Sequence, residues 1–186
     1  MNEVLRAIRS RRSTRKFKIE QIKKEQIEAI LEAGIYAPSA HNDQSWNFTV
    51  IRNEEILEEI NTKSKKEAED HEDKILRKMA NNPELNIFYN APTVVIVSGD
   101  ENAMMPETDC AAATENMLIA AESLNIGSCW CGFVKFLFES EKGTYYKEIL
   151  KIPKGYKPYY AIALGYKDVK VAKAPKRKEN CIQYIE

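Results

Sequence analysis

Basic side chains gather near both ends of the chain, where they could bind a phosphate group. Residues 4–18 contain no acid and seven cations: Arg6, Arg9, Arg11, Arg12, Arg15, Lys16 and Lys18. Residues 167–178 are also rich in Lys and Arg, with Asp168 as the sole acid. Each charge-assisted hydrogen bond to a phosphate oxygen is worth about 1.5–3 kcal/mol. Either both runs are solvated surface, or they converge on one phosphate-bearing ligand.

Metal and thiol chemistry find little support. Cys129 and Cys131 form a ligand-like pair, and His41 and His71 are the available histidines. A structural zinc site takes four ligands, usually in two spaced pairs, and the other two cysteines do not form such a pair. A nucleophilic pair between either thiol and His41 would need an activated thiol, and nothing local marks one. We therefore expect no metal site and free thiols rather than disulfides.

The remaining polar segments point to a small ligand that is not a dinucleotide bound by a glycine-rich turn. The chain has 7 Gly, and it lacks both the Gly-x-Gly-x-x-Gly and the Walker-type patterns. What remains is a cationic turn at 11–15, a polar loop at 38–44, an aromatic turn with Gly at 129–132, and a cationic tail at 176–178. These pieces suit a ligand with a phosphate, hydroxyls and a flat heteroaromatic ring.

Composition limits the class of protein. The chain has 186 residues, 44% of them hydrophobic, and 28 basic residues balance 28 acidic ones. A single domain over 1–186 is expected, and a zero net charge argues against a nucleic-acid coat protein. Apolar runs are much shorter than the roughly 20 residues of a membrane helix, and the charged N-terminus does not resemble a signal peptide. We expect a cytoplasmic protein with no membrane or nucleic-acid partner.

Four strands must position the polar segments. Apolar and β-branched runs predict them at 46–51, 93–97, 128–131 and 159–164. The run 93–97 is apolar on both faces, which is typical of a central strand. Helical segments separate these strands, so the sequence predicts an α+β or α/β sandwich.

Helices are indicated by apolar spacing and by capping residues. One follows Asn2 and frays after Ser10, and a second places Ile27, Ile30, Leu31 and Ile35 on its core face before Pro38 stops it. Asn53 caps a third helix. Further helices are predicted at 67–80, 109–124 and 145–150. The helix at 109–124 is apolar almost all round and should lie in the core or an interface.

Several segments match a known family in order and spacing. They are Arg11-Arg12-Ser13-Thr14-Arg15-Lys16-Phe17, the segment 37–48 from Ala37-Pro38-Ser39 to Trp46-Asn47-Phe48, Gly127 to Phe133, Ile152 to Pro158, and Ala161 to Tyr166 before a basic tail. In these pieces the chain resembles the nitroreductase-like family of FMN-dependent oxidoreductases. The resemblance covers most of the chain and leaves residues 60–92 unsupported.

The resemblance implies both a fold and a reaction. The fold would be α+β, a three-layer α/β/α sandwich with a central mixed, mainly antiparallel sheet, in a domain-interlocked homodimer. The reaction would pass a hydride from NADH or NADPH through bound FMN to nitroaromatic, quinone or similar flat electrophilic acceptors, in a ping-pong sequence. FMN carries the chemistry, so no side chain is named as catalytic.

The resemblance also implies which residues bind FMN. Arg11, Arg12 and Ser13 would hold phosphate or ribityl oxygens, and Arg15 would face the ring, where a cation favours the negative charge that reduction adds. The tail would bring Lys176 and Arg177 to the same phosphate, and Lys178 could replace either of them.

Two more segments complete the implied site. Pro38, Ser39, Asn42 and Gln44 match a loop that reaches the flavin of the neighbouring subunit. Cys131 and Gly132 match the place where backbone amides lie beside flavin N5 and the C4 carbonyl, and a small residue there lets the main chain approach the ring.

Some features depart from the family pattern or allow a different function. His41 stands where a small residue is frequent, and Ser45 stands where Pro commonly precedes Trp, which bears on substrate preference. The scaffold could also serve dehalogenation, dehydrogenation or flavin breakdown. The chain could instead carry a basic nucleic-acid-binding arm at Arg6–Lys18, or be a non-catalytic FMN-binding protein whose pocket is closed by residues 60–92.

Overall fold

A central antiparallel sheet organises the molecule. The computed structural model describes residues 1–169 and 173–186. Within these, the strands β1 (Trp46–Ile51), β2 (Thr93–Asp100), β3 (Gly127–Cys131) and β4 (Tyr156–Gly165) pair in the order β1-β2-β4-β3. A parallel bridge between Ser13 and Ser128 adds a short mixed element at the β3 edge. All four predicted strands are present, and β2 and β4 are longer than predicted.

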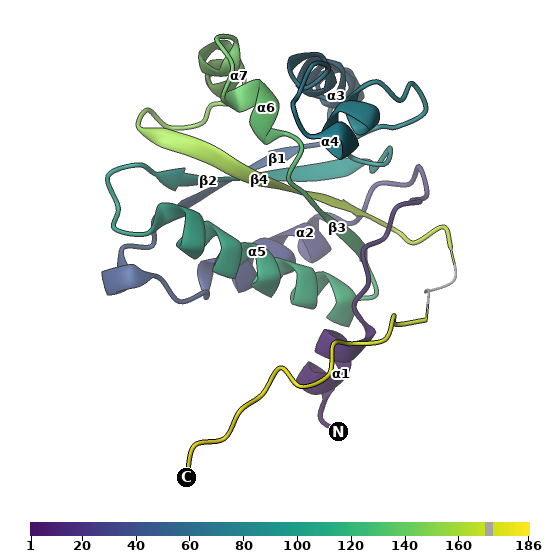
Figure 1. Ribbon diagram of the computed structural model, residues 1–186, viewed down its shortest axis with the longest axis vertical. Helices are drawn as coiled ribbons and strands as arrows, with labels where there is room; N and C mark the ends of the chain where they lie inside the picture. Colours follow the sequence, from purple (N-terminus) through teal and green to yellow (C-terminus); the bar gives the residue numbers. More distant parts are fainter. Residues whose placement is uncertain (170–172) are drawn as a thin grey trace.

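Helices cover both faces of the sheet (Figure 1). On one face lie α2 (Lys24–Ile35) and α5 (Pro106–Ser123). On the other lie α3 (Glu54–Glu67), α4 (Lys74–Ala80), α6 (Lys135–Phe138) and α7 (Gly143–Ile149). The predicted three-layer α/β/α arrangement is therefore confirmed.

Strand β2 shows how two cores form around one sheet. Val94 and Ile96 pack into the core under α3 and α6, while Val95 and Val97 pack into the core against α2 and α5. Successive side chains of a strand point to opposite faces, so a run that is apolar at every position fills both cores. These four side chains are fully buried, as predicted for a central strand.

Helix α5 is the main support of the second core. Cys110, Ala113, Met117 and Ala121 are fully buried along its length. It packs against α2, where Ile27 and Ile30 are buried as predicted. The prediction for Ile35 is wrong: its side chain is 52% exposed, because the position that faces the core in the last turn of α2 is the buried Gly34, which lies against Met117 and Phe48.

The predicted helix at 67–80 is wrong in its extent. Helix α3 continues to Glu67, the chain then turns, and α4 begins only at Lys74. Asp73 starts α4 because its carboxylate accepts the backbone N–H groups of Ile75 and Leu76 at 2.7 and 3.1 Å. Apolar spacing alone did not reveal this competing cap.

The two ends of the chain meet beside the β3 edge. Helix α1 (Glu3–Ser10) is capped by Asn2, as predicted, and packs on α5. Residues 173–186 contain no helix or strand, and Figure 1 shows this segment passing α1. Lys170, part of the C-terminal cationic run, lies outside the described residues. No helix in the described part of the chain is long and apolar enough to cross a membrane.

Candidate functional site

The turn that carries the N-terminal cations is fastened to the edge of the sheet. The backbone N–H of Thr14 donates to the Ser128 carbonyl at 2.9 Å, next to the Ser13–Ser128 bridge. Thr14 is buried, and a Cβ added to Gly127 would lie 2.9 Å from its methyl group. Gly127 thus allows the turn to lie close against β3. This contact fixes the backbone from Arg11 to Arg15.

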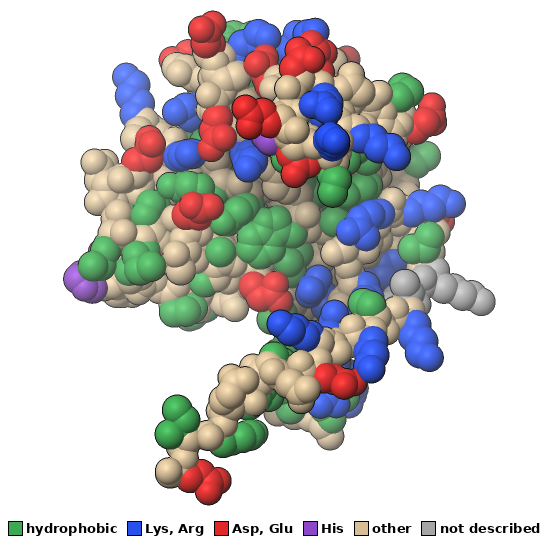
Figure 2. Space-filling model, viewed as in Figure 1, with side chains coloured by type: hydrophobic (Ala, Val, Ile, Leu, Met, Phe, Trp, Pro, Cys, Tyr) green, Lys and Arg blue, Asp and Glu red, His purple; other side chains and the backbone are tan. Residues whose placement is uncertain are grey.

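A cationic cavity of about 300 Å³ lies where this turn meets the C-terminal segment. This cationic cavity is lined by Arg11, Arg12, Ser13, Arg15, Lys173, Pro175 and Arg177. In the part of the chain that the structure describes, none of these lining residues is an acid. Figure 2 shows Lys and Arg side chains crowded at the lower right, where the two terminal segments meet. Residues more than 150 positions apart in sequence therefore present their charges to one space.

The donor set of this cavity fits an anion. Arg12 donates from Nη1 to the Arg9 carbonyl at 2.8 Å, but its buried Nε has no hydrogen-bond partner among the described residues. A buried donor without a partner costs free energy, more when it is charged. A phosphate oxygen in the cavity would satisfy such a donor.

The tail residues do not all reach the cavity. Arg177 lines it, whereas Lys176 points to Glu179 at 2.8 Å and is 84% exposed. Lys178 is not part of the lining. Lys173 and Pro175 line the cavity but were not singled out from the sequence. The charge run predicted that the tail was involved, but in an irregular segment it could not say which side chains turn inward.

A second, apolar cavity of about 520 Å³ adjoins the turn after β3. From the strands and the turn it is lined by Trp130, Cys131, Gly132, Phe133, Pro158, Tyr159 and Tyr160. From the segment that the resemblance left unsupported it is lined by Leu76, Met79, Leu85, Ile87 and Tyr89. A Cβ added to Gly132 would meet no atom of the described residues within 4 Å. Residues 60–92 thus line an open space instead of filling it.

Arg15 and Tyr89 join the two cavities. Arg15 lines the cationic cavity and donates from Nε to the Tyr89 hydroxyl at 3.4 Å. Its guanidinium carbon also lies 5.6 Å from the centre of the Tyr89 ring, which is within cation–π range. The hydrogen bond to Tyr89 raises the pKa of Arg15 above its usual value. Arg15 therefore carries its charge at the border between the polar and the apolar space.

The two thiols of β3 lie beside the same cations. The pKa of Cys129 is lowered to about 7, first by a hydrogen bond from the Cys131 thiol and then by Arg15, Ser13 and Arg11. The pKa of Cys131 is raised well above its usual value, because it donates that bond and is buried. All four cysteines are free thiols. Among the described residues no three His, Cys, Asp or Glu side chains form a metal-ligand group.

The loop with Pro38, Ser39, Asn42 and Gln44 lines neither cavity. Its backbone is left-handed at three residues that are not glycine: His41, Asn42 and Gln44, with φ of 50°, 59° and 47°. Such conformations cost about 1–2 kcal/mol each and persist where neighbours enforce them.

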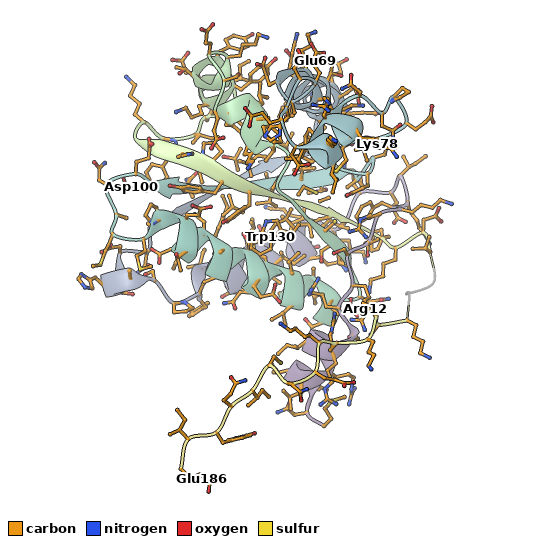
Figure 3. All side chains as sticks on the ribbon, viewed as in Figure 1. Arg12, Glu69, Lys78, Asp100, Trp130 and Glu186 are labelled. Atoms are coloured by element: carbon orange, nitrogen blue, oxygen red, sulfur yellow. The ribbon has the colours of Figure 1, made fainter. Side chains whose placement is uncertain are left out.

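Buried polar contacts enforce that conformation. The Asp109 carboxylate, 2% exposed, accepts the Ala40 N–H at 3.0 Å and the Ser45 hydroxyl at 2.8 Å. The Ser45 carbonyl accepts the N–H of Asp100 at 2.9 Å, and Figure 3 shows Asp100 on the opposite side of the molecule from Arg12. Ser45, which departs from the family pattern, therefore helps to hold a loop that lies far from the cationic cavity of its own chain.

Comparison with known proteins identifies the family to which this fold belongs. The family model described as "Nitroreductase family" matches residues 8–166. The chain belongs to the nitroreductase family. A nitroreductase with bound FMN from Bacteroides fragilis NCTC 9343 is 38% identical, with a TM-score of 0.92 and full coverage of both chains.

Two further relatives agree. A nitroreductase with bound FMN from Desulfitobacterium hafniense DCB-2 is 30% identical, with a TM-score of 0.89 and full coverage of both chains. A curated protein of Archaeoglobus fulgidus, named as a candidate NADH dehydrogenase/NAD(P)H nitroreductase, is 35% identical over 89% of this chain and 86% of the relative. The predicted family and fold of this nitroreductase are thus confirmed.

Proposed function

We propose that this nitroreductase binds FMN across the two cavities, with the phosphate in the cationic cavity and the ring beside Cys131 and Gly132. The observation that carries this proposal is the junction between the cavities, where Arg15 and Tyr89 are hydrogen-bonded. A ligand with an anion at one end and a flat ring at the other matches that pair of spaces. The FMN held by two similar solved nitroreductases supports the proposal.

The chain's own residues divide the work of binding. Arg11, Arg12, Ser13 and Arg177 bind phosphate or ribityl oxygens, and Arg12 Nε gains the partner that it otherwise lacks. Gly132 lets the backbone approach the ring, because no side chain intervenes. Lys176, with its Glu179 partner, lies outside the lining, so Lys173 is its replacement in the proposed set.

Arg15 orients and tunes the ring. Its guanidinium stays charged at any working pH and lies at the border of the apolar cavity, beside the hydroxyl and the ring of Tyr89. FMN, when bound, supplies the chemistry that accepts and passes on a hydride. A fixed cation beside the ring favours the state that carries more negative charge.

The apolar cavity serves both reaction partners in turn. NADH or NADPH would donate there and leave, and a nitroaromatic, quinone or similar flat electrophile would follow in a ping-pong sequence. Its aromatic and aliphatic lining offers stacking and apolar contact. Four charged residues also line it: Glu107, Lys135 and the Lys157–Glu139 pair at 3.0 Å. Stacking on the aromatic part of this lining gives little discrimination between flat acceptors. We assign no side chain as acid or base.

The loop from Pro38 to Gln44 acts across a dimer. The loop lines neither cavity of its own chain. Pro38, Ser39, Asn42 and Gln44 therefore contact flavin only if a second copy brings them there. The contacts of Asp109 then hold the loop in shape for the partner's site. A homodimer follows as the working unit.

The test uses purified protein incubated with FMN, freed of unbound ligand, and sized by light scattering. We expect a yellow dimer whose visible absorbance falls when NADH or NADPH is added without oxygen, and returns when a quinone or nitroaromatic follows. A colourless monomer that takes up no FMN would contradict the proposal. A yellow dimer whose absorbance does not fall with NADH or NADPH would support FMN binding and contradict the proposed reductase activity.

A further inference from the structure

Tyr89 occupies a strained position that nothing in its own sequence requires. Its φ is 57°, and that of the next residue, Asn90, is 55°. A bulky aromatic residue seldom adopts the left-handed region, because its Cβ lies too close to the following carbonyl oxygen. Strain of this kind persists where the surroundings enforce it, and it is often found at functional sites.

Asn86 enforces this conformation locally. Its side-chain oxygen accepts the N–H of Phe88 at 2.9 Å and, at 3.4 Å, that of Asn90. Its backbone carbonyl accepts the N–H of Tyr89 at 2.9 Å. One asparagine therefore holds the residue before Tyr89, Tyr89 itself and the residue after it.

Helix α3 anchors the same loop from below. The Asn86 amide donates to Glu58 at 3.1 Å, and the buried Asn61 accepts the Ile87 N–H at 2.9 Å. Ile87 and Phe88 are themselves buried. The loop is thus fixed at several points, and the outcome is a tyrosine held against Arg15.

We propose that Tyr89 is a positioning residue for Arg15 and fixes its guanidinium where it biases bound FMN toward reduction. The proposal deepens the proposed function and rests on FMN binding at this site. Arg15 is exposed, so without a partner its long side chain would sample many rotamers. The Tyr89 hydroxyl and ring hold it by a hydrogen bond and by a cation–π contact. The segment 60–92 then has a role in tuning the cofactor as well as in lining the cavity.

The experiment compares substitutions of Tyr89 and of its support. Tyr89→Phe keeps the ring but loses the hydroxyl, Tyr89→Leu loses both, and Asn86→Ala releases the loop without touching Arg15. Asn82→Ala is the matched control, because Asn82 accepts the Glu84 N–H in the same segment but does not hold Tyr89. Each protein is loaded with FMN, and two quantities are measured: the FMN dissociation constant by fluorescence, and the midpoint potential of bound FMN against a reference dye.

We expect Tyr89→Phe to lower the ratio of reduced to oxidised FMN by about tenfold at a given potential, which is about 30 mV for a two-electron couple. The dissociation constant should stay within about threefold, because the phosphate contacts are untouched. Tyr89→Leu should shift the potential further, Asn86→Ala should shift it in the same direction, and Asn82→Ala should leave it unchanged.

Failure of this inference is distinguishable from failure of the proposed function. If wild-type protein binds no FMN, both are wrong. If FMN binds normally and both Tyr89 variants keep the wild-type midpoint potential, the positioning role is wrong and FMN binding stands. A lower melting temperature with an unchanged potential would likewise reduce Tyr89 to a structural role. Tyr89→Phe retains the ring and its packing, so it tests the hydroxyl even if Tyr89→Leu does not fold.

Discussion

The cationic cavity is formed by irregular segments, whereas the apolar cavity is formed mainly by strands and helices. The cationic cavity takes its lining from two segments near the termini that contain no helix or long strand. The apolar cavity takes its lining from β3, β4, α6, the start of α5 and the residues around α4. Charged residues without acidic neighbours stand out in a sequence. Residues that wall an apolar cavity are of the same types as those that fill a core. The residues of the cationic cavity are therefore easier to predict from the sequence than the residues of the apolar cavity.

The sharpest test of the cationic cavity compares two adjacent tail residues. Arg177→Ala should raise the FMN dissociation constant about tenfold to hundredfold, because it removes charge-assisted hydrogen bonds worth about 1.5–3 kcal/mol. Lys176→Ala should change it no more than about twofold, because that side chain pairs with Glu179 in solvent. Fluorescence titration at two salt concentrations measures both. If Lys176→Ala raises the dissociation constant more than Arg177→Ala, Lys176 binds the phosphate instead. If both changes are small, the C-terminal segment does not bind FMN.

Substitutions at two glycines distinguish an effect on stability from an effect on FMN binding in the apolar cavity. A Cβ added to Gly143 would lie 2.2 Å from the Phe138 carbonyl oxygen, whereas one added to Gly132 would meet open space. Gly143→Ala should therefore lower the free energy of unfolding by about 1–3 kcal/mol, or the melting temperature by roughly 3–10 °C. Gly132→Ala should keep the melting temperature and weaken FMN binding. Thermal melts with and without FMN check both predictions. If the Gly132→Ala protein binds FMN normally, the proposed position of the flavin ring beside Gly132 is wrong.

Arg15 and Arg11 should differ in what their loss affects. Arg15→Ala should slow reduction of bound FMN by NADH or NADPH about tenfold, or about 1.4 kcal/mol in the barrier, while affinity changes less. Arg11→Ala should chiefly release FMN, because it lies in the cationic cavity and not at its border with the apolar one. Stopped-flow reduction and fluorescence titration measure the two effects. Identical behaviour of the two variants would undo the division between the cavities.

The smallest expected effect is a titration in FMN-free protein. With its pKa lowered to about 7, Cys129 should be about one-tenth thiolate at pH 6 and about nine-tenths at pH 8. Cys110, whose pKa burial raises to about 12, should stay protonated. Ultraviolet absorbance of the thiolate follows this change, and Cys129→Ser should remove the component with its midpoint near pH 7. Arg15→Ala should move the midpoint to higher pH because a cation that favours the thiolate is lost, and an unmoved midpoint would mean that the charge of Arg15 does not reach β3.

Much of the fold was predictable because it depends on local apolar patterns. The run from Val94 to Val97 fills both cores, so its pattern specified a central strand. Asn2 and Asn53 cap helices as predicted, because capping needs only near neighbours. The break between α3 and α4 was missed, since Asp73 can serve equally well in the middle of a polar helix face or as a cap. Its spacing from apolar residues is compatible with both.

The candidate site was predictable in part for the same reason. The cationic turn at 11–15 and Arg177 line one cavity, and their charge and their motif had marked them. Tyr89 carried no such signal, because its position depends on Asn86 and on contacts with α3 that sequence spacing does not reveal. The role of the Pro38–Gln44 loop depends on a second copy of the chain, because the loop lines neither cavity of its own chain.

The cationic cavity also limits when a cofactor could be taken up. Its lining joins residues 11–15 to Lys173, Pro175 and Arg177, which the ribosome adds roughly 160 residues later. Domains often begin to fold while synthesis continues, starting from the N-terminus. Here the sheet and its helices can form before the second half of the cationic cavity has been made, so FMN can be held firmly only after Lys173, Pro175 and Arg177 have left the ribosome.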